Sequence, residues 1–194
     1  MTATLPRSVP MRGCRGDTML TFISGGCKNG KSWYAQRLAK AAGLPLYYVA
    51  TMISTGAEDD ARIARHIRER DGWGFKTVEC GRDIASCPEC ADAGGSYLLD
   101  SVTALLANEM FAPEGFDAAA PERVADQLEI FAGRVGSAVF VSDYIYGDAV
   151  IYDEWTENYL RGLALIDKRL AKICDNVLEV SAGCVICHKG VRLL

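Results

Sequence analysis

One segment constrains the fold of this chain more than any other feature. Residues 25–32 read Gly-Gly-Cys-Lys-Asn-Gly-Lys-Ser and satisfy the spacing G-x-x-x-x-G-K-[ST]. The apolar run 20–24 precedes the segment and a helical pattern over 32–42 follows it, so it joins a strand to a helix. The alternative is an ordinary glycine-rich turn before a helix. Such a turn does not account for the full spacing of the motif or for its place between a strand and a helix. The sequence therefore predicts a phosphate-binding loop whose nucleotide contacts are Gly25, Gly26, Cys27, Lys28, Asn29, Gly30, Lys31 and Ser32.

The chemistry of such a loop assigns roles to its last two residues. Backbone N–H groups and the helix N-terminus attract phosphate oxygens, while Lys31 reaches the β- and γ-phosphates as a catalytic residue. The hydroxyl of Ser32 ligates Mg²⁺. All of these contacts are to phosphates, so both GTP and ATP fit the loop.

A second acid at a strand end is expected to help hold the metal. Asp100 ends the apolar run 97–100 and is the candidate. The other interpretation is that Asp100 caps the helix predicted to begin at Val102, because Asp is a favoured residue at a helix N-cap. The spacing alone does not decide between these two roles.

Apolar runs alternate with longer helical patterns along the chain. Further strands are predicted at 46–50, 75–79, 97–100, 138–142 and 177–181, and further helices at 59–70, 102–111, 121–135 and 154–174. This alternation predicts an α/β fold with a mostly parallel sheet and helices on both faces. Without a repeat or linker, residues 19–194 are expected to form a single nucleotide-binding domain. Residues 1–18 contain arginine, proline and glycine, and are either a disordered tail or a mis-called start.

Composition narrows the class of protein. Lys and Arg number 21 against 25 Asp and Glu, a net charge of −4 that argues against a broad nucleic-acid-binding surface. No apolar run approaches the roughly 20 residues of a membrane-spanning helix, and residues 1–18 lack the apolar stretch of a signal peptide. We therefore expect a soluble cytoplasmic protein whose eight cysteines are reduced.

Two Cys-x-x-Cys pairs stand far apart in the chain, at Cys87 and Cys90 and at Cys184 and Cys187. Four thiolates would suit tetrahedral zinc if the fold brought the pairs together. Buried or surface thiols are the preferred interpretation, because the interval between the pairs is much longer than in a zinc ribbon.

His66 lies in the polar helical segment 59–70, with Arg62, Arg65 and Arg70 close by. A histidine on such a helix is usually a solvated surface residue. The arginines, however, form an electropositive patch that suits a phosphate chain, with Arg62 and Arg70 as nucleotide contacts. In that setting an imidazole would serve as a nucleophile toward the α-phosphorus of a nucleotide.

Taken together, these residues resemble the bifunctional adenosylcobinamide kinase / adenosylcobinamide-phosphate guanylyltransferase family of cobalamin biosynthesis. The resemblance runs from about residue 19 to residue 183. The segments that carry it are residues 25–32, Ala50-Thr51, Arg62-Ile63-x-x-His66-x-x-x-Arg70, Thr77-x-Glu79 and Leu98-Leu99-Asp100-x-x-Thr103 with Asn108.

The resemblance implies a RecA-like P-loop NTPase fold, a homotrimer, and nucleotide and corrinoid small molecules as ligands. It implies phosphorylation of adenosylcobinamide by a nucleoside triphosphate, followed by GMP transfer from GTP through a guanylylated His66. The additional nucleotide contacts that it implies are Ala50, Thr51, Met52, Glu79 and Asp100.

The chain also departs from the family pattern. Asp143-Tyr144 stands where the family usually has Asn-Glu, and Asp167-Lys168 where it tends to show Asn-Gln. Cys27-Lys28-Asn29 replaces Ala-Arg-Ser inside the loop, at positions expected to contribute mainly backbone. Two other functions therefore stay open: a P-loop small-molecule kinase without guanylyl transfer, and a nucleotide-binding protein without turnover.

Overall fold

The computed structural model describes residues 19–43, 45–148 and 150–191, so both interpretations of residues 1–18 lie outside the described residues. The main strands are β1 (Met19–Gly25), β2 (Leu46–Ala50), β3 (Phe75–Glu79), β4 (Ser96–Asp100), β7 (Ser137–Asp143), β8 (Asn176–Ser181) and β9 (Cys184–Lys189). A small hairpin consists of β5 (Phe111–Ala112) and β6 (Gly115–Phe116). The helices are α1 (Lys31–Ala41), α2 (Ala57–Glu69), α3 (Val102–Met110), α4 (Ala120–Arg134) and α5 (Glu154–Ile173), with a short 3₁₀ helix η1 (Ile84–Cys90).

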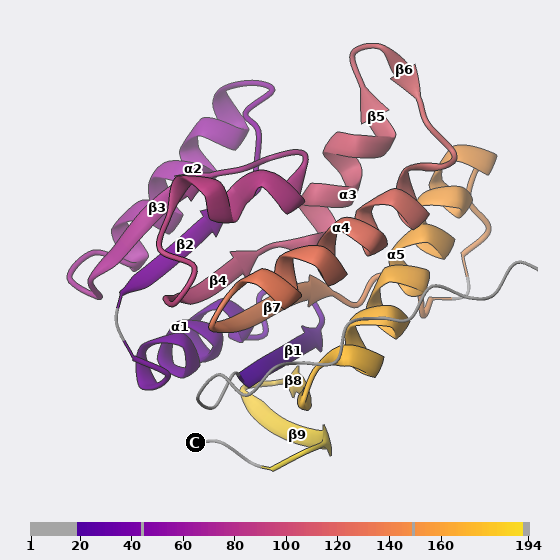
Figure 1. The fold of residues 1–194 in the computed structure, drawn as a ribbon. Coiled ribbons are helices and arrows are strands. Elements are labelled where there is room, and N and C mark those ends of the chain that lie inside the picture. Colours follow the sequence, from indigo (N-terminus) through magenta and orange to yellow (C-terminus); the bar gives the residue numbers. More distant parts are fainter. Residues whose placement is uncertain (1–18, 44, 149, 192–194) are drawn as a thin grey trace, which may run out of the picture.

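Seven strands form one sheet in the order β3-β2-β4-β7-β1-β8-β9 (Figure 1). Every neighbouring pair is parallel except β8–β9, which is antiparallel. The predicted mostly parallel sheet is thus confirmed, as are the six predicted strands within a residue of their bounds. Strand β7 lies between β1 and β4, so the ends of these three strands meet at one edge of the sheet.

Strand β9, the β5–β6 hairpin and η1 were not predicted from the sequence. Strand β9 follows a tight turn in which Ala182 and Gly183 both adopt positive φ, at 49° and 77°. Such turns favour Asn-Gly or Asp-Gly, so an alanine at the first position gives little local signal. The strand itself is mostly exposed, and only Val185 of its residues is partly buried.

Two hydrophobic clusters pack on opposite faces of the sheet. Successive residues of β1 alternate between them, with Phe22 in one cluster and Ile23 in the other. Helix α1 covers the Ile23 face, whereas α3, α4 and α5 pack against the Phe22 face (Figure 1). Helices on both faces were predicted, and this arrangement leaves the strand ends free to carry loops.

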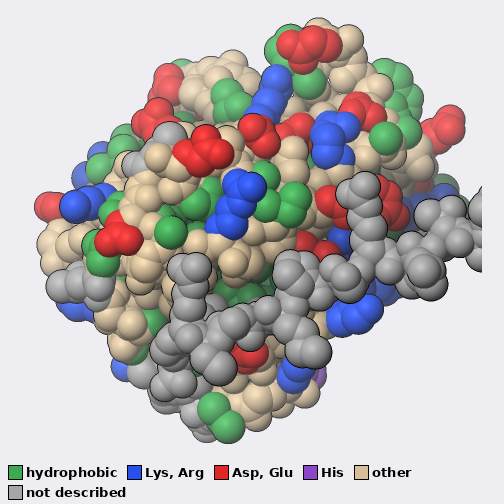
Figure 2. Space-filling view, viewed as in Figure 1, with side chains coloured by type: hydrophobic (Ala, Val, Ile, Leu, Met, Phe, Trp, Pro, Cys, Tyr) green, Lys and Arg blue, Asp and Glu red, His purple; other side chains and the backbone are tan. Residues whose placement is uncertain are grey.

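Helix α2 differs from the other helices because none of its residues is fully buried. It carries acidic residues in its first turn and His66 and Arg68 in its last turn, which complements the helix dipole. No helix among the described residues is long and apolar enough to cross a membrane. On the face shown in Figure 2, acidic and basic side chains are interspersed with small groups of hydrophobic ones.

Candidate functional site

A cleft of about 1800 Å³ opens between the glycine-rich loop and α2, at the carboxyl ends of the parallel strands. This is the edge where parallel α/β sheets commonly bind ligands. The predicted site residues that line it are Cys27, Lys28, Asn29, Gly30, Lys31, Ser32, Ala50, Met52, Arg62, His66, Arg70, Glu79 and Asp100. The predicted contacts Gly25, Gly26 and Thr51 do not line it. Asp143, noted in the sequence only as a departure, also lines the cleft.

The glycine-rich loop runs from β1 into α1, as its spacing predicts. Gly25 has φ 154°, and a Cβ there would collide with the carbonyl oxygen of Val180, so only glycine fits this close approach. Gly30, at φ 90°, is the N-cap of α1. The Asn29 side chain donates a hydrogen bond to the Val180 carbonyl at 3.3 Å. The Asn29 side chain thus ties the loop to β8, and the expectation that position 29 contributes mainly backbone to the phosphate contacts stays a prediction.

Lys31 is the cation at the base of the cleft. Its side chain is only 6% exposed. The Nζ atom donates to the Gly26 carbonyl at 2.6 Å and to Asp143 Oδ1 at 2.9 Å. A buried ammonium needs such partners, so the loop lysine is held between its own loop and the end of β7.

Asp100 lies at the end of β4 and faces the cleft. Its Oδ2 atom accepts a hydrogen bond from the Tyr48 hydroxyl at 3.0 Å. The alternative role of Asp100 as a helix cap is wrong, because Ser101 caps α3 by accepting from the Ala104 N–H at 3.2 Å. A capping side chain must sit at the N-cap position itself, which leaves the Asp100 carboxylate for the cleft.

Arg70 joins α2 to the sheet. Its guanidinium lies 4.1 Å from the centre of the Tyr48 ring and donates to Thr77 Oγ1 at 3.0 Å. Burial and the Asp100 charge raise the pKa of the Tyr48 hydroxyl, so it stays a neutral donor. Arg70 is buried by these contacts, in contrast to the exposed Arg62 and Arg65 that extend the positive surface.

His66 faces the cleft from α2 rather than standing free in solvent. Its side chain is 25% exposed, and its Nδ1 atom lies 3.3 Å from Glu69 Oε2. A carboxylate at Nδ1 orients the ring and favours the tautomer that keeps a lone pair on Nε2. The structure thus places His66 and the glycine-rich loop on one cleft, while Glu69 is a partner that the sequence analysis did not single out.

Asn108 on α3 fixes the wall of the cleft. Its Nδ2 atom donates to the Thr51 carbonyl at 2.7 Å and to the Gly81 carbonyl at 2.9 Å. The Thr51 hydroxyl exchanges hydrogen bonds with the Ser101 backbone at 2.7 and 2.8 Å. The Thr51 side chain therefore holds the backbone at Ser101, and Thr51 is absent from the residues that line the cleft.

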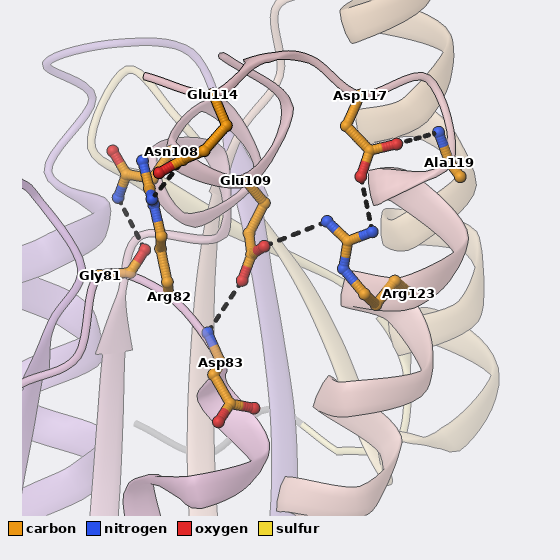
Figure 3. Close-up of polar contacts among 9 residues, drawn as sticks. All are labelled: Gly81, Arg82, Asp83, Asn108, Glu109, Glu114, Asp117, Ala119 and Arg123. Carbon is orange, nitrogen blue, oxygen red and sulfur yellow. Dashed lines mark hydrogen bonds and ion pairs between the residues drawn. The ribbon is translucent and has the colours of Figure 1, made fainter. Parts of the chain in front are cut away.

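Glu109, the residue after Asn108 on α3, also holds the loops beside the cleft in place (Figure 3). Glu109 accepts from the Asp83 N–H at 2.8 Å and from Arg123 at 3.2 Å, and Arg123 also contacts Asp117 at 2.6 Å. Arg82 and Glu114 also line a small hollow beside these residues. The network holds the 81–83 loop and the base of the β5–β6 hairpin against α3 and α4.

A buried acid lies behind the β7 end of the cleft. Asp167 on α5 is 4% exposed, and its Oδ2 atom accepts from the Tyr146 hydroxyl at 3.0 Å. Burial is the main cause that raises the pKa of Asp167 to about 6, and the charge of Asp143 raises it further. The hydroxyls of Ser142 and Tyr146 act in the opposite direction.

Three of the four cysteines in the two Cys-x-x-Cys pairs have side chains that the structure describes. Cys87 is buried against the core, whereas Cys184 and Cys187 are exposed on β9. No group of three or more His, Cys, Asp or Glu residues within ranges 19–43, 45–148 and 150–191 has the arrangement of a metal site.

Comparison with known proteins gives consistent results. The sequence model of the family described as cobinamide kinase / cobinamide phosphate guanyltransferase matches residues 21–187. The bifunctional adenosylcobalamin biosynthesis protein CobP of Pseudomonas aeruginosa is 31% identical over 180 residues, which cover 90% of this chain and 100% of that protein. The bifunctional adenosylcobalamin biosynthesis protein CobU of Salmonella typhimurium is 28% identical over 181 residues, or 85% of this chain and 97% of that protein.

A solved structure from Pyrococcus horikoshii OT3 has a TM-score of 0.53 at 9% identity, covering 90% of this chain and 87% of that one. At this level of identity the likeness concerns the fold alone. Together with the loop between β1 and α1, the parallel sheet identifies an α/β fold of the P-loop NTPase class.

Proposed function

The chain belongs to the cobinamide kinase / cobinamide phosphate guanyltransferase family, and we propose that it carries out both reactions in one cleft. It phosphorylates adenosylcobinamide with GTP or ATP, then transfers GMP from GTP to adenosylcobinamide phosphate through His66. The observation that carries this proposal is that His66 and the phosphate loop line the same cleft. The homotrimer and the cytoplasmic location expected from the resemblance belong to the same proposal.

The kinase reaction draws on the phosphate loop. Backbone N–H groups of residues 26–32 and the N-terminus of α1 bind the triphosphate, and Lys31 stabilises charge on the β- and γ-phosphates. Arg62 and Arg70 extend this binding toward α2. Ala50, Met52 and Glu79 lie at the ends of β2 and β3 as the remaining nucleotide contacts, with Thr51 supporting them from behind.

The donor atoms beside the loop fit Mg²⁺. The Ser32 hydroxyl and the Asp100 carboxylate both line the cleft, and oxygen ligands are those that Mg²⁺ prefers. When bound, the ion would neutralise charge on the phosphate oxygens. Tyr48 holds one oxygen of Asp100 and leaves the other to face the ligand.

The guanylyl transfer draws on His66. Its Nε2 lone pair attacks the α-phosphorus of GTP, a P–N bond forms, and pyrophosphate leaves. A phosphate oxygen of the acceptor then attacks the same phosphorus and breaks the P–N bond, which returns the imidazole. Glu69 holds the Nδ1 proton throughout, because its carboxylate lies 3.3 Å away.

Intact-mass spectrometry after incubation with GTP and Mg²⁺ tests this step. The unmodified protein should gain the mass of one guanylyl group, and His66→Ala should gain none. His188→Ala is the matched control, because His188 is also paired with a glutamate, Glu179 at 2.9 Å, but lies on β9 away from the cleft.

The two other functions give different results in the same experiment. A P-loop kinase without guanylyl transfer would phosphorylate cobinamide and form no adduct. A nucleotide-binding protein without turnover would bind GTP through Lys31 and leave both substrates unchanged. An adduct that persists in His66→Ala would exclude His66 as the nucleophile.

A further inference from the structure

The end of β7 carries a carboxylate that the proposed function does not use. We infer that Asp143 is the general base of the kinase reaction and accepts the proton of the alcohol that attacks the γ-phosphate. This inference rests on the proposed function and adds a residue to it. It starts from the contact between Asp143 Oδ1 and Lys31 Nζ at 2.9 Å.

The backbone on both sides of Asp143 is held in place. Its N–H donates to Thr103 Oγ1 at 2.9 Å, and the N–H of Tyr144 donates to the Gly25 carbonyl at 2.9 Å. Gly25 is also the partner of Asp143 in the parallel pairing of β1 with β7. The carboxylate is therefore fixed relative to the phosphate loop, as a catalytic base on a rigid element should be.

The other acids of the cleft are less suitable. Glu58, Glu69 and Asp71 belong to α2 and the turn that follows it, and Glu79 ends β3, which is separated from β7 by two strands, β2 and β4. Asp100 is one strand further from the loop than Asp143 and already accepts from Tyr48. Among the described residues, Asp143 is the acid that pairs with the loop lysine, and its side chain remains 24% exposed to the cleft.

This placement suits the chemistry of phosphoryl transfer. The lysine that contacts Asp143 is the one expected to contact the β- and γ-phosphates, so the carboxylate lies beside the γ-phosphate in the bound state. The alcohol oxygen forms a bond to the γ-phosphorus while the bond to the nucleoside diphosphate breaks. The hydroxyl proton passes to Asp143, and the diphosphate leaves with the bonding electrons.

The residue after Asp143 carries no carboxylate: Tyr144 is 52% exposed, and its ring packs against Tyr146. Asp143 is therefore the acid at the end of this strand, in direct contact with Lys31.

The Asp143→Asn variant tests the inference, with adenosylcobinamide, ATP or GTP, and Mg²⁺. Loss of a general base should lower kcat by roughly 10²-fold or more. Nucleotide affinity should stay the same or rise, because Lys31 loses a competing anion. Guanylylation of His66 should continue, since the imidazole needs no base there. This combination separates a catalytic role from a folding defect, because a folding defect would lower kcat, nucleotide affinity and guanylylation together.

Two further variants complete the experiment. Asp148→Asn is the control, because Asp148 is exposed and accepts from Tyr152 outside the cleft; its kcat should be unchanged. Asp143→Glu keeps a carboxylate and should retain more activity than Asp143→Asn.

Several outcomes would overturn the assignment. One is an Asp143→Asn variant whose kcat stays within about threefold of the unmodified protein, against the 10²-fold or more expected of a base. Another is a loss that excess Mg²⁺ restores, which would make Asp143 a metal ligand. If the unmodified protein phosphorylates no cobinamide, the proposed function fails and the inference fails with it. If the unmodified protein phosphorylates cobinamide and the Asp143→Asn variant is equally active, the inference is refuted while the proposed function stands.

Discussion

The buried carboxylate of Asp167 gives a stability prediction with a defined sign. In the folded protein its pKa is raised from 3.8 to about 6, mainly by burial. Between these two pH values the folded state binds more protons at this group than the unfolded state does, so stability falls as pH rises through that window. The loss levels off once the pH is above the folded-state pKa of about 6.

The magnitude follows from the two pKa values. The difference between 3.8 and about 6 corresponds to about 3 kcal/mol, at about 1.4 kcal/mol per pH unit. Asp167→Asn removes the charge but keeps a carbonyl oxygen that can accept from Tyr146. We therefore expect this variant to be up to about 3 kcal/mol more stable than the unmodified protein at pH 7.5, and nearly equal to it at pH 4.

Urea unfolding at pH 4 and pH 7.5 measures both differences. Asp148→Asn is the matched control, because that aspartate also accepts a tyrosine hydroxyl, from Tyr152 at 2.7 Å, but on the surface; its stability should not change with pH relative to the unmodified protein. A gain for Asp167→Asn that is equal at both pH values, or absent at pH 7.5, would refute the reasoning that ionisation of the buried acid costs stability.

Two further predictions concern the cleft. Lys31→Ala should weaken nucleotide binding roughly 10- to 100-fold, the loss of one charged contact worth about 1.5–3 kcal/mol; titration calorimetry measures it, and unchanged affinity would contradict the role of the lysine. Asn108→Ala leaves the carbonyls of Thr51 and Gly81 without their donor, so it should lower the free energy of unfolding by about 1–3 kcal/mol; urea unfolding measures it, and a neutral result would mean that water replaces the amide.

Much of the fold could be predicted because the relevant signals are local. The apolar runs that became β1, β2, β4 and β7 are buried strands bounded by polar residues, and the helical patterns between them cover the sheet. The hairpin and β9 escaped prediction for the opposite reason. The strands of the hairpin have only two residues each. Strand β9 is mostly exposed, and the turn before it, at Ala182-Gly183, uses a residue that is not typical of positive φ.

The residues of the candidate site also fall into two groups: those that could be predicted from a local pattern and those that could not. A phosphate loop is one continuous segment, so its residues and spacing are visible in the sequence. His66 lies on another element, and the arginines around it predicted an anion-binding surface without showing what that surface faces. Asp143 is 112 residues from Lys31 in the chain, and no local pattern links them.

The sequence by itself thus determined the class of fold, the phosphate loop and the resemblance to the family that the comparisons then showed. The structure showed that Ser101 caps α3, which leaves Asp100 for the cleft, and that Glu69 lies beside His66; both contacts join residues three apart in the chain. Only the tertiary structure brought Asp143 to the loop lysine. The physical reason is that parallel strands align their carboxyl ends at one edge of the sheet, where side chains distant in sequence become neighbours.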